Sequence, residues 1–421
     1  MNNLIQPKLL RDVIKLDKGK PPAQQGYYGP DAALYLTPDY LRGGAQPEHV
    51  KPSSNAVHVK DGETIVLWDG SNAGEIFRSK QGVLASTMAR VIHSEDYDSN
   101  YFFFALKGWE GYLKGQTSGS GIPHVDKEVL GKLTLFEFPK TEQSKIAEVL
   151  SKVDQAIEHT ESLIAKQQRI KTGLMRDILT RGIDEHGNLR SEETHQFKDS
   201  PLGRIPVEWG VKQIQDSNIS LVDGDRGENY PKQDDLLDAG YCLFLSAKNV
   251  TCSGFQFSDC QFISETRHKK MGSGTVAKND VILTTRGTVG NLAFSTGAEP
   301  YQVIRINSGM IILRNNEPGL LTPYFYESLR NLIFAIEHQR SGSGSAQPQL
   351  PARDIKMFHF LKPSPEEQNR IVDVCKHIEN RRMDSYNSLL KLRSLKNALM
   401  QDLLTCKKRV TPLMEDMEVG S

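Results

Sequence analysis

The 421-residue sequence lacks the features that mark secreted, membrane-spanning and disulfide-stabilised proteins. It has no charged N-terminal segment followed by an apolar core, and no apolar run approaches the roughly 20 residues that cross a bilayer. Its five cysteines are scattered and odd in number, which is typical of reduced thiols. These absences predict a cytoplasmic protein that binds no membrane.

The sequence also lacks an excess of charge of one sign. Lys+Arg and Asp+Glu both total 52, so the formal net charge is zero. Because general affinity for nucleic acid depends on positive charge, any DNA binding must come from local basic clusters. The length and the 38% hydrophobic content fit two or three globular domains.

Motifs of ATP-binding and methyl-transferring enzymes are missing. There is no Gly-x-x-x-x-Gly-Lys-Ser/Thr phosphate loop, and no Asn/Asp-Pro-Pro-Tyr/Phe tetrapeptide of the amino-methyltransferase type. Cys242, Cys252, Cys260 and His268 match no spacing of zinc ligands, and buried or strand-edge cysteines are the simpler interpretation. The sequence therefore predicts no catalytic residue, no metal and no cofactor bound by this chain.

What the sequence does contain is a helical segment that occurs twice. Residues 142–150 read EQSKIAEVL and residues 367–375 read EQNRIVDVC, while the copies end as GLMRDILT and ALMQDLLT. The offset at the start, 367 − 142, and the offset at the end, 405 − 180, are both 225, so the helix has kept its length. The sequence between the copies differs far more, which favours the helices as a spacer.

Apolar residues recur along both copies at steps of three and four, the pattern of a helix that buries one stripe. About forty helical residues span about 60 Å, which is more than one globular face would cover. The pattern therefore favours an antiparallel coiled coil over a helix packed only on its own domain. The predicted spacer and subunit-docking residues are Ile146, Val153, Ile157, Ile164, Leu174, Ile178, Ile371, Ile378, Leu389, Leu399 and Leu403.

The repeat divides the chain, and the order globular–helix–globular–helix predicts an α+β protein built by tandem duplication. Each globular segment has a β-prone run that enters a Gly-rich turn, at residues 65–74 and 281–290. The predicted parts are a first domain (1–140), a first helix (141–181), a turn-rich connector (182–206), a second domain (207–362), a second helix (363–406) and a polar tail (407–421).

The helices and the connector resemble those of the specificity subunit of type I restriction–modification systems. The resemblance rests on Pro-x-x-Glu-Gln-x-x-Ile at residues 139–146, on the Leu-Met…Leu-Thr helix ends, and on TRGIDEHG (180–187) and FKDSPLG (197–203) in the connector. One departure is that the first domain lacks the Pro-x-x-Trp opening that the second domain has at residues 206–209.

The globular segments resemble target-recognition domains of the same family. DGDRGENYP (223–231) and LTTRGTVGN (283–291) are similar to one domain type, and LWDGSNAGE (67–75) to another. The resemblance implies that each domain reads one half of a bipartite duplex DNA site, and that the helices set the spacing and dock two modification (methyltransferase) subunits.

The same resemblance implies that the cofactors belong to partner subunits. S-adenosylmethionine would be bound by the modification subunits, and ATP and Mg by the restriction (motor) subunits that join for cleavage. Two alternatives stay open: a stand-alone fused methyltransferase, which the missing motifs oppose, and a scaffold that joins proteins without reading DNA.

Candidate DNA contacts are basic or polar residues in predicted loops. Arg267, His268, Lys269 and Lys270 form the densest basic cluster and suit phosphate contact, although a solvated loop is equally consistent. Arg286 follows a predicted strand, where its guanidinium could reach a guanine edge or form a structural ion pair. Weaker candidates are Arg226, Arg78, Lys80, and Arg340 and Gln347, which flank a Ser-Gly-Ser-Gly segment that alternatively serves as a hinge.

Overall fold

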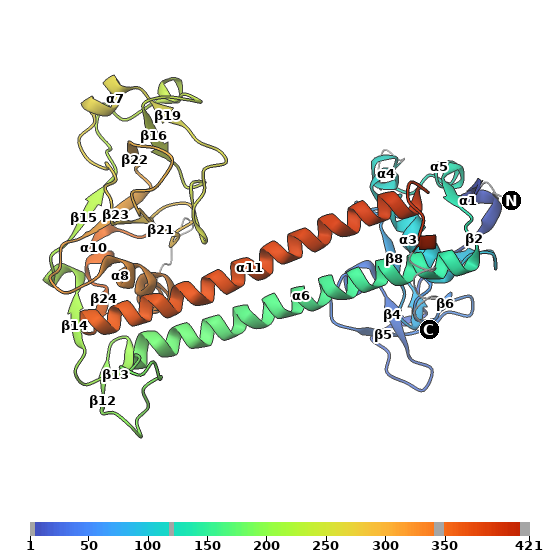
Figure 1. Ribbon diagram of the computed structural model, residues 1–421, viewed down its shortest axis with the longest axis horizontal. Helices are drawn as coiled ribbons and strands as arrows, with labels where there is room; N and C mark the ends of the chain where they lie inside the picture. The colour runs from blue at the N-terminus through green and yellow to red at the C-terminus, as the bar shows by residue number, and fades with distance from the viewer. Residues whose placement is uncertain (1–4, 118–121, 341–348, 413–421) are drawn as a thin grey trace. The chain divides into compact units, whose positions relative to one another are not determined.

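The computed structural model describes residues 5–117, 122–340 and 349–412, with residues 338–340 as backbone only. The chain forms two compact units, unit 1 from Met1–Leu163 with Ser385–Ser421 and unit 2 from Ile164–Asp384. Each unit has a globular part and takes one segment from each of two long helices, α6 (Lys140–Arg181) and α11 (Pro365–Leu404) (Figure 1).

The globular part of unit 1 combines twisted sheets with short helices. Its strands are β1 (Pro7–Leu9), β2 (Ile14–Lys18), β3 (Gln24–Gln25), β4 (Ala33–Leu36), β5 (Glu48–Lys51), β6 (His58–Val59), β7 (Thr64–Leu67), β8 (Ile76–Arg78), β9 (Gly82–Leu84), β10 (Met88–His93) and β11 (Thr134–Phe136). Its helices are α1 (Leu10–Val13), α2 (Pro38–Leu41), α3 (Ser99–Lys107), α4 (Glu110–Gly115) and α5 (Lys127–Lys132).

The globular part of unit 2 follows the connector. Its strands are β12 (Phe197–Ser200), β13 (Gly203–Pro206), β14 (Gly210–Gln213), β15 (Ile219–Asp223), β16 (Cys242–Leu245), β17 (Val250–Thr251), β18 (Gly254–Phe255), β19 (Phe262–Ile263), β20 (Asp280–Thr284), β21 (Leu292–Phe294), β22 (Ile304–Ile306), β23 (Met310–Asn315) and β24 (His359–Lys362). Its helices are η1 (Ile214–Asp216), η2 (Gln233–Asp235), α7 (Glu265–Lys270), α8 (Thr322–Ser328), η3 (Leu329–Ile333), α9 (Phe334–Arg340) and α10 (Ala352–Lys356).

The two units share one sheet topology. A four-stranded antiparallel sheet has the order β2-β10-β7-β8 in unit 1 and β15-β23-β20-β21 in unit 2. A second sheet contains one parallel pair in each unit, β4 with β9 and β16 with β22, and a two-stranded ribbon, β1-β11 or β14-β24, leads toward the long helix. This correspondence confirms the predicted α+β chain with two repeated domains.

The central strands are apolar on both faces because each sheet lies between two cores. In β20, Val281 and Leu283 pack into the core that includes the helices, whereas Ile282 packs into the core of the second sheet. In β7, Val66 and Ile65 divide in the same way. Successive side chains of a strand point to opposite faces, so a strand covered on both sides reads as a continuous apolar run.

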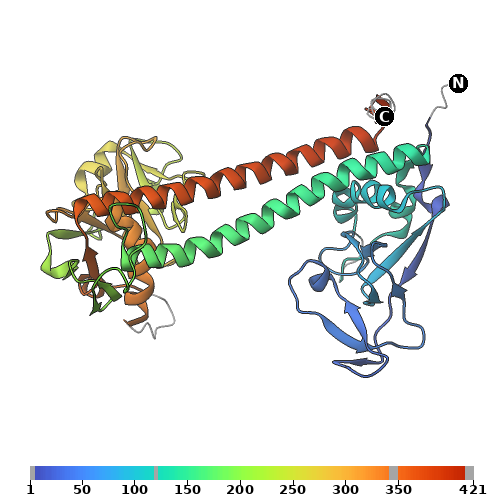
Figure 2. The ribbon, with the colours of Figure 1, turned by 60° about the horizontal axis from the view of Figure 1, so that its bottom comes forward.

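Within each unit the segments of α6 and α11 run antiparallel, side by side in both ribbon views (Figures 1 and 2). In unit 1 the Nζ of Lys396 lies 2.6 Å from Oδ1 of Asp154. In unit 2 the Nζ of Lys171 lies 2.6 Å from Oε2 of Glu379. Both pairs join equivalent positions of the repeat, because 396 − 171 and 379 − 154 are each 225.

The helix ends differ from a simple coiled-coil seam, because they enter the globular cores. Ile146 and Leu403 are buried in the core of unit 1, and Ile178 and Ile371 in that of unit 2. The two helices therefore pack on each other along their length and on the domains at their ends. Packing on the domains is the alternative that the sequence pattern disfavoured. The remaining predicted seam residues are partly or fully buried: Val153, Ile157, Ile164, Leu174, Ile378, Leu389 and Leu399.

The predicted domain limits stay predictions. The two compact units are defined by contacts, and each includes part of both helices, so they do not test limits that were set along the sequence. Among the helices of the described residues, none has the length and apolar character needed to cross a bilayer.

Candidate nucleic-acid interface

Three loops of unit 2 meet at one edge of the four-stranded sheet. The strands β15 and β20 end at this edge, and β23 begins there, since Asp223 pairs with Ile311 and Thr284 with Met310. The loops are residues 224–232, 285–291 and the turn 307–309. The recognition edge, as we call this loop cluster, gathers two of the segments that the sequence singled out.

Gly224 allows the backbone of the first loop to pass within contact distance of the turn 307–309. A Cβ on Gly224 would lie 2.1 Å from the carbonyl oxygen of Asn307, so no other residue fits there. In unit 1 a Cβ on Gly19 would lie 2.1 Å from the carbonyl oxygen of Ala85. Residues 19–23, 68–75 and 85–87 of unit 1 therefore form an equivalent recognition edge.

Asp225 fixes the shape of the first loop in unit 2. Its carboxylate accepts hydrogen bonds from the amides of Gly227 at 2.8 Å and Gly272 at 2.6 Å. These backbone donors hold the pKa of Asp225 below its ordinary value. The hydroxyl of Tyr230 in turn accepts a 3.4 Å hydrogen bond from the amide of Ser308, so this loop is attached at both ends.

Arg286 combines an anchored backbone with an exposed side chain. Its amide donates to the carbonyl of Gly309 at 3.2 Å, and its backbone forms a bridge with Gln349. Within the described residues its guanidinium makes no hydrogen bond or ion pair. No described residue therefore competes with a ligand for its five guanidinium N–H groups.

The other basic candidates of unit 2 are partly engaged. Arg226 lies 3.1 Å from Asp223, and Arg267 lies 2.5 Å from Asp235. Lys269 pairs with Glu265 at 2.7 Å across one turn of α7. The Arg226 and Lys269 pairs face solvent and are weak enough for a phosphate to replace the carboxylate partner, whereas the Arg267 pair is half-buried. Lys270 is exposed and has no ion pair within the described part of the chain.

Arg78 and Lys80 lie away from the recognition edge of unit 1. Arg78 pairs with Thr64 at the start of β7, whereas the loop follows the end of that strand. Its guanidinium lies 4.2 Å from the ring centroid of Phe103, and burial lowers its pKa. Lys80 lies over the ring of Tyr40 at 5.1 Å. Gln347 and the side chain of Arg340 lie outside the described residues.

Sequence reasoning missed Lys18 and Lys20 of unit 1. They flank Gly19: Lys18 is the last residue of β2, and Lys20 lies in the loop equivalent to that of Arg226. Lys18 lies 2.8 Å from Asp69, which belongs to the neighbouring Gly-rich loop, while Lys20 is exposed. The available signal was the glycine that follows a β-prone run in both halves, at positions 19 and 224.

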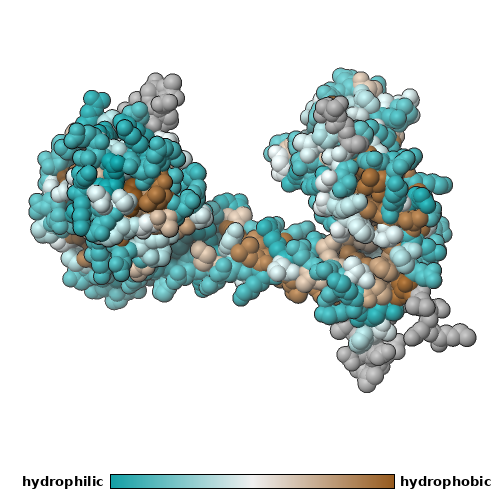
Figure 3. All heavy atoms as spheres, turned by 90° about the horizontal axis from the view of Figure 1, so that it is seen from above, coloured by the Kyte–Doolittle hydropathy of each residue, from teal (hydrophilic) through white to brown (hydrophobic). Residues whose placement is uncertain are grey.

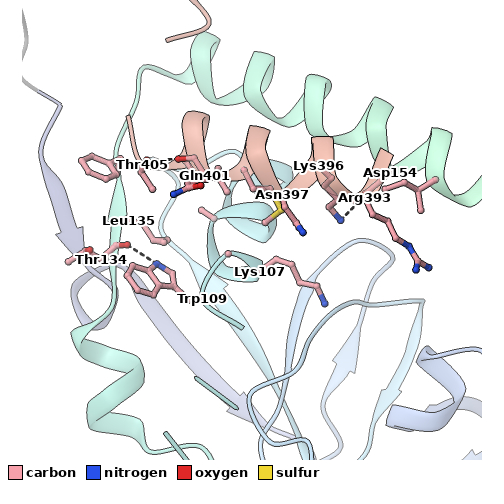
Figure 4. A pocket seen from close by; sticks show the side chains of 16 residues that line it. Lys107, Trp109, Thr134, Leu135, Asp154, Arg393, Lys396, Asn397, Gln401 and Thr405 are labelled. Atoms are coloured by element: carbon pink, nitrogen blue, oxygen red, sulfur yellow. Dashed lines mark hydrogen bonds and ion pairs between the residues drawn. The ribbon is translucent and has the colours of Figure 1, made fainter. Parts of the chain in front are cut away.

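A second repeated feature lies where each domain meets the helices. In unit 1 a cavity of 740 Å³ lies between α11 and the segment around Lys107 and Trp109 (Figure 4). In unit 2 a cavity of 330 Å³ lies against α6. Four helix residues that line the smaller cavity are equivalent in the repeat to four that line the larger one: Gln168, Lys171, Thr172 and Met175, and Arg393, Lys396, Asn397 and Met400.

The described residues contain no group of three or more His, Cys, Asp or Glu side chains placed to hold a metal ion. The recognition edges offer hydrogen bonding and charge, from arginine, lysine and backbone amides. These groups suit contact with phosphates and base edges.

Comparisons with known proteins agree with the repeat. A family model described as the type I restriction modification DNA specificity domain matches residues 4–167 and 206–391. The chain is 29% identical to the type I restriction enzyme MjaVIII specificity subunit of Methanocaldococcus jannaschii, over 96% of this chain and 92% of that protein. It is 21% identical to the EcoBI specificity subunit of Escherichia coli, over 79% of this chain and 70% of that protein.

Two solved structures share the fold. The S subunit of a type I restriction–modification system from M. genitalium gives a TM-score of 0.55 at 17% identity, over 96% of this chain and 97% of that one. A chain solved in work on complex assembly and conformational transition of the type I R-M system gives 0.56 at 13% identity, over 95% and 97%. At these identities the likeness concerns the fold alone.

Proposed function

The chain belongs to the type I restriction–modification DNA specificity family, and on that premise we propose that each of its units reads one half of a bipartite duplex DNA site. The observation that carries the proposal is the recognition edge, which is built twice on the same sheet topology but carries different side chains. Because the two recognition edges share a backbone arrangement but differ in their side chains, they suit two half-sites of different base sequence.

In unit 2, Arg286 is the proposed base-reading residue, since its exposed guanidinium can donate two parallel hydrogen bonds to O6 and N7 of a guanine. Arg226, Arg267, Lys269 and Lys270 are proposed phosphate contacts that set register without reading sequence. In unit 1 we assign the phosphate role to Lys18 and Lys20. Local clusters of this kind give DNA affinity to a chain whose net charge is zero.

The long helices are the proposed docking surface for two methyltransferase subunits. Ile170 on α6 and Leu395 on α11 occupy equivalent positions and are 54% and 48% exposed. Lysines precede both by four residues, at positions 166 and 391. A surface that the duplication presents twice fits two copies of one partner. Along the helices in Figure 3, patches of apolar side chains interrupt the hydrophilic surface.

We assign no catalytic step to this chain. The proposal is supported by the missing phosphate loop and the missing amino-methyltransferase tetrapeptide. S-adenosylmethionine, ATP and Mg would be bound by the methyltransferase and restriction subunits, and this chain would select where they act.

Selection of bound duplexes from a random library tests the proposal. The purified chain, alone and with its methyltransferase partner, should enrich two short motifs at a fixed gap, with an affinity that falls steeply as salt rises. Enrichment of one continuous motif would contradict two separate reading heads. Enrichment of no motif in either setting would leave the scaffold alternative as the better account.

A further inference from the structure

One fully buried glutamine lies at the start of each long helix, where the helix leaves its domain. Gln143 lies in the first turn of α6 and Gln368 in the first turn of α11, and both side chains are 0% exposed. They are equivalent positions of the repeat, since 368 − 143 is 225. A buried carboxamide is costly unless its polar atoms are satisfied, so its partners reveal its role.

The carboxamide of Gln143 joins the helix entrance to a loop of its own domain. Nε2 donates to the carbonyl of Phe138 at 2.7 Å, just before the helix, and to that of Asp96 at 2.9 Å. Oε1 accepts from the amide of Asp98 at 2.6 Å. Asp98 is the N-cap of α3, and its side chain accepts from the first turn of that helix.

Gln368 makes the same three contacts with different residues. Nε2 donates to the carbonyl of Pro363 at 2.9 Å and to that of Gly319 at 2.8 Å. Oε1 accepts from the amide of Leu321 at 2.7 Å. Leu321 is the N-cap of α8, so each glutamine links the start of a long helix to the start of a domain helix.

The preceding glutamates hold, in each unit, the segment that follows the other long helix. Glu367 accepts from Nε1 of Trp209 at 3.0 Å and from the amide of Ile183 at 2.9 Å, which attaches the connector after α6. Glu142 accepts from Nε of Arg409 at 2.8 Å, which attaches the segment after α11. Each junction therefore has two parts: a glutamate that holds the segment leaving the other helix, and a glutamine that links the helix to its own domain.

We propose that Gln143 and Gln368 are positioning residues that fix the angle between each recognition domain and its helix, and thereby the gap between half-sites that the protein accepts. The inference rests on the proposed function. Helix length alone sets the gap only if the domains cannot tilt at the junctions. Each carboxamide bonds both to the helix entrance and to the domain, so it resists tilting of one against the other. Because each added base pair lengthens the gap by about 3.4 Å, a junction that cannot tilt accepts a gap of only one length.

The test measures methylation by the complex with the methyltransferase subunits, on duplexes whose gap is the preferred one or one base pair longer or shorter. Gln143→Met and Gln368→Met keep the side-chain length and remove all three hydrogen bonds. We expect the rate at the altered gaps, relative to the preferred gap, to rise about tenfold in either variant. The preferred bases of both half-sites should stay unchanged.

Matched controls separate positioning from general loss of stability. Leu36→Ala in unit 1 and Leu245→Ala in unit 2 each remove a buried side chain from the second core of its domain, away from the junction. These variants should lower the melting temperature and leave the gap preference unchanged. If they widen the accepted gap as much as the methionine variants do, the positioning role is wrong.

Folded methionine variants that keep the wild-type gap preference would also overturn the inference. Should they not assemble, Gln143→Asn and Gln368→Asn take their place, since the shorter amide cannot reach both sides of the junction. The same widening is then expected, and an unchanged gap again refutes the role. Absence of a bipartite preference in the wild-type protein is a separate outcome, which refutes the function itself and the inference with it.

Discussion

At the scale of single residues, the recognition edge of unit 2 depends on hydrogen bonds that fix the loops while the side chain of Arg286 stays exposed. Asp225 and Tyr230 attach the first loop, and Gly309 anchors the backbone of Arg286. Because the backbone is already anchored, binding orders only the side chain of Arg286 and not the loop that carries it, which lowers the entropy cost of recognition.

Replacement of Arg286 by alanine should weaken binding and relax specificity at one position of the second half-site. The loss of a bidentate guanine contact corresponds to about 1–3 kcal/mol, or about fivefold to about 150-fold in affinity. Competition binding with duplexes that vary one base at a time measures both effects. The melting temperature should not change, because the side chain has no partner in the described chain.

The matched control for Arg286 is Arg353→Ala, which removes another exposed arginine, outside the recognition edge. Its affinity should stay within about twofold of wild type, because a single distant charge is largely screened. If Arg286→Ala behaves like Arg353→Ala, then Arg286 does not contact a base.

Glu317 is a buried carboxylate that makes the stability of unit 2 depend on pH. Lys212 on β14, the amide of Asn218 and Lys362 on β24 lower its pKa to about 2. Because the folded pKa lies below the unfolded value of about 4.3, the stabilisation is complete above that value and is lost as pH falls toward 2.

Glu317→Gln should therefore reduce the free energy of unfolding of unit 2 at pH 7 by about 2 kcal/mol, a figure that allows for solvent screening of the half-exposed Lys212. Urea unfolding at pH 7 and pH 3 should show the difference from wild type shrinking as the solution becomes more acidic. Glu228→Gln, at an exposed position of the loop, should show no such trend. A constant difference at both pH values would mean that the carboxylate charge is not responsible.

The residues that the sequence could identify are those whose role follows from local pattern. Arg286 and Arg226 stand beside glycines in turn-like strings, so both were candidates. Lys20 was missed because the correspondence between its loop and the loop of Arg226 depends on a close approach of Gly19 to a distant turn. Arg78 stays a candidate, but it lies away from the recognition edge because β8 runs back antiparallel to β7, a pairing that the sequence does not reveal.

At the scale of elements, the long helices were predictable and the sheets were not. Periodicity and a constant offset define α6 and α11 locally. The parallel pairing of β4 with β9, by contrast, joins strands that four others separate in the sequence, and it leaves no local signature. The helix ends also pack into the domain cores, which a periodic stripe alone does not distinguish from a coiled-coil seam.

The exposed apolar positions on the helices lead to a prediction about stoichiometry. Ile170→Asp and Leu395→Asp place a charge on equivalent positions of the proposed docking surface. Each single variant should bind one methyltransferase subunit in place of two, and the double variant should bind none, because a desolvated unpaired carboxylate opposes association. Native mass spectrometry counts the bound subunits.

Tyr28→Asp is the control for these variants, because it adds the same charge at a 76% exposed position outside the helices. It should leave two bound subunits. Full binding by the double variant would place the docking surface elsewhere.

At the scale of the whole molecule, the length of the paired helices should set the gap. Insertion of seven residues between Leu163 and Ile164 together with seven between Asp384 and Ser385 lengthens both by about 10 Å, or about three base pairs. The preferred gap should grow by that amount, with the same bases read. Selection from a random library measures both.

The same insertion between His186 and Gly187, in the exposed turn of the connector, should leave the gap unchanged. If the helix insertions alter the bases and not the gap, the helices do not act as a spacer.

Unit 2 is one continuous stretch of chain, whereas unit 1 joins residues 1–163 to residues 385–421. Leu403 and Val410 belong to the core of unit 1. During synthesis, the first domain to leave the ribosome must therefore wait for the last residues before its core is closed. Unit 2, although made later, has its whole sequence first, so the nascent chain completes its fold from the middle outward.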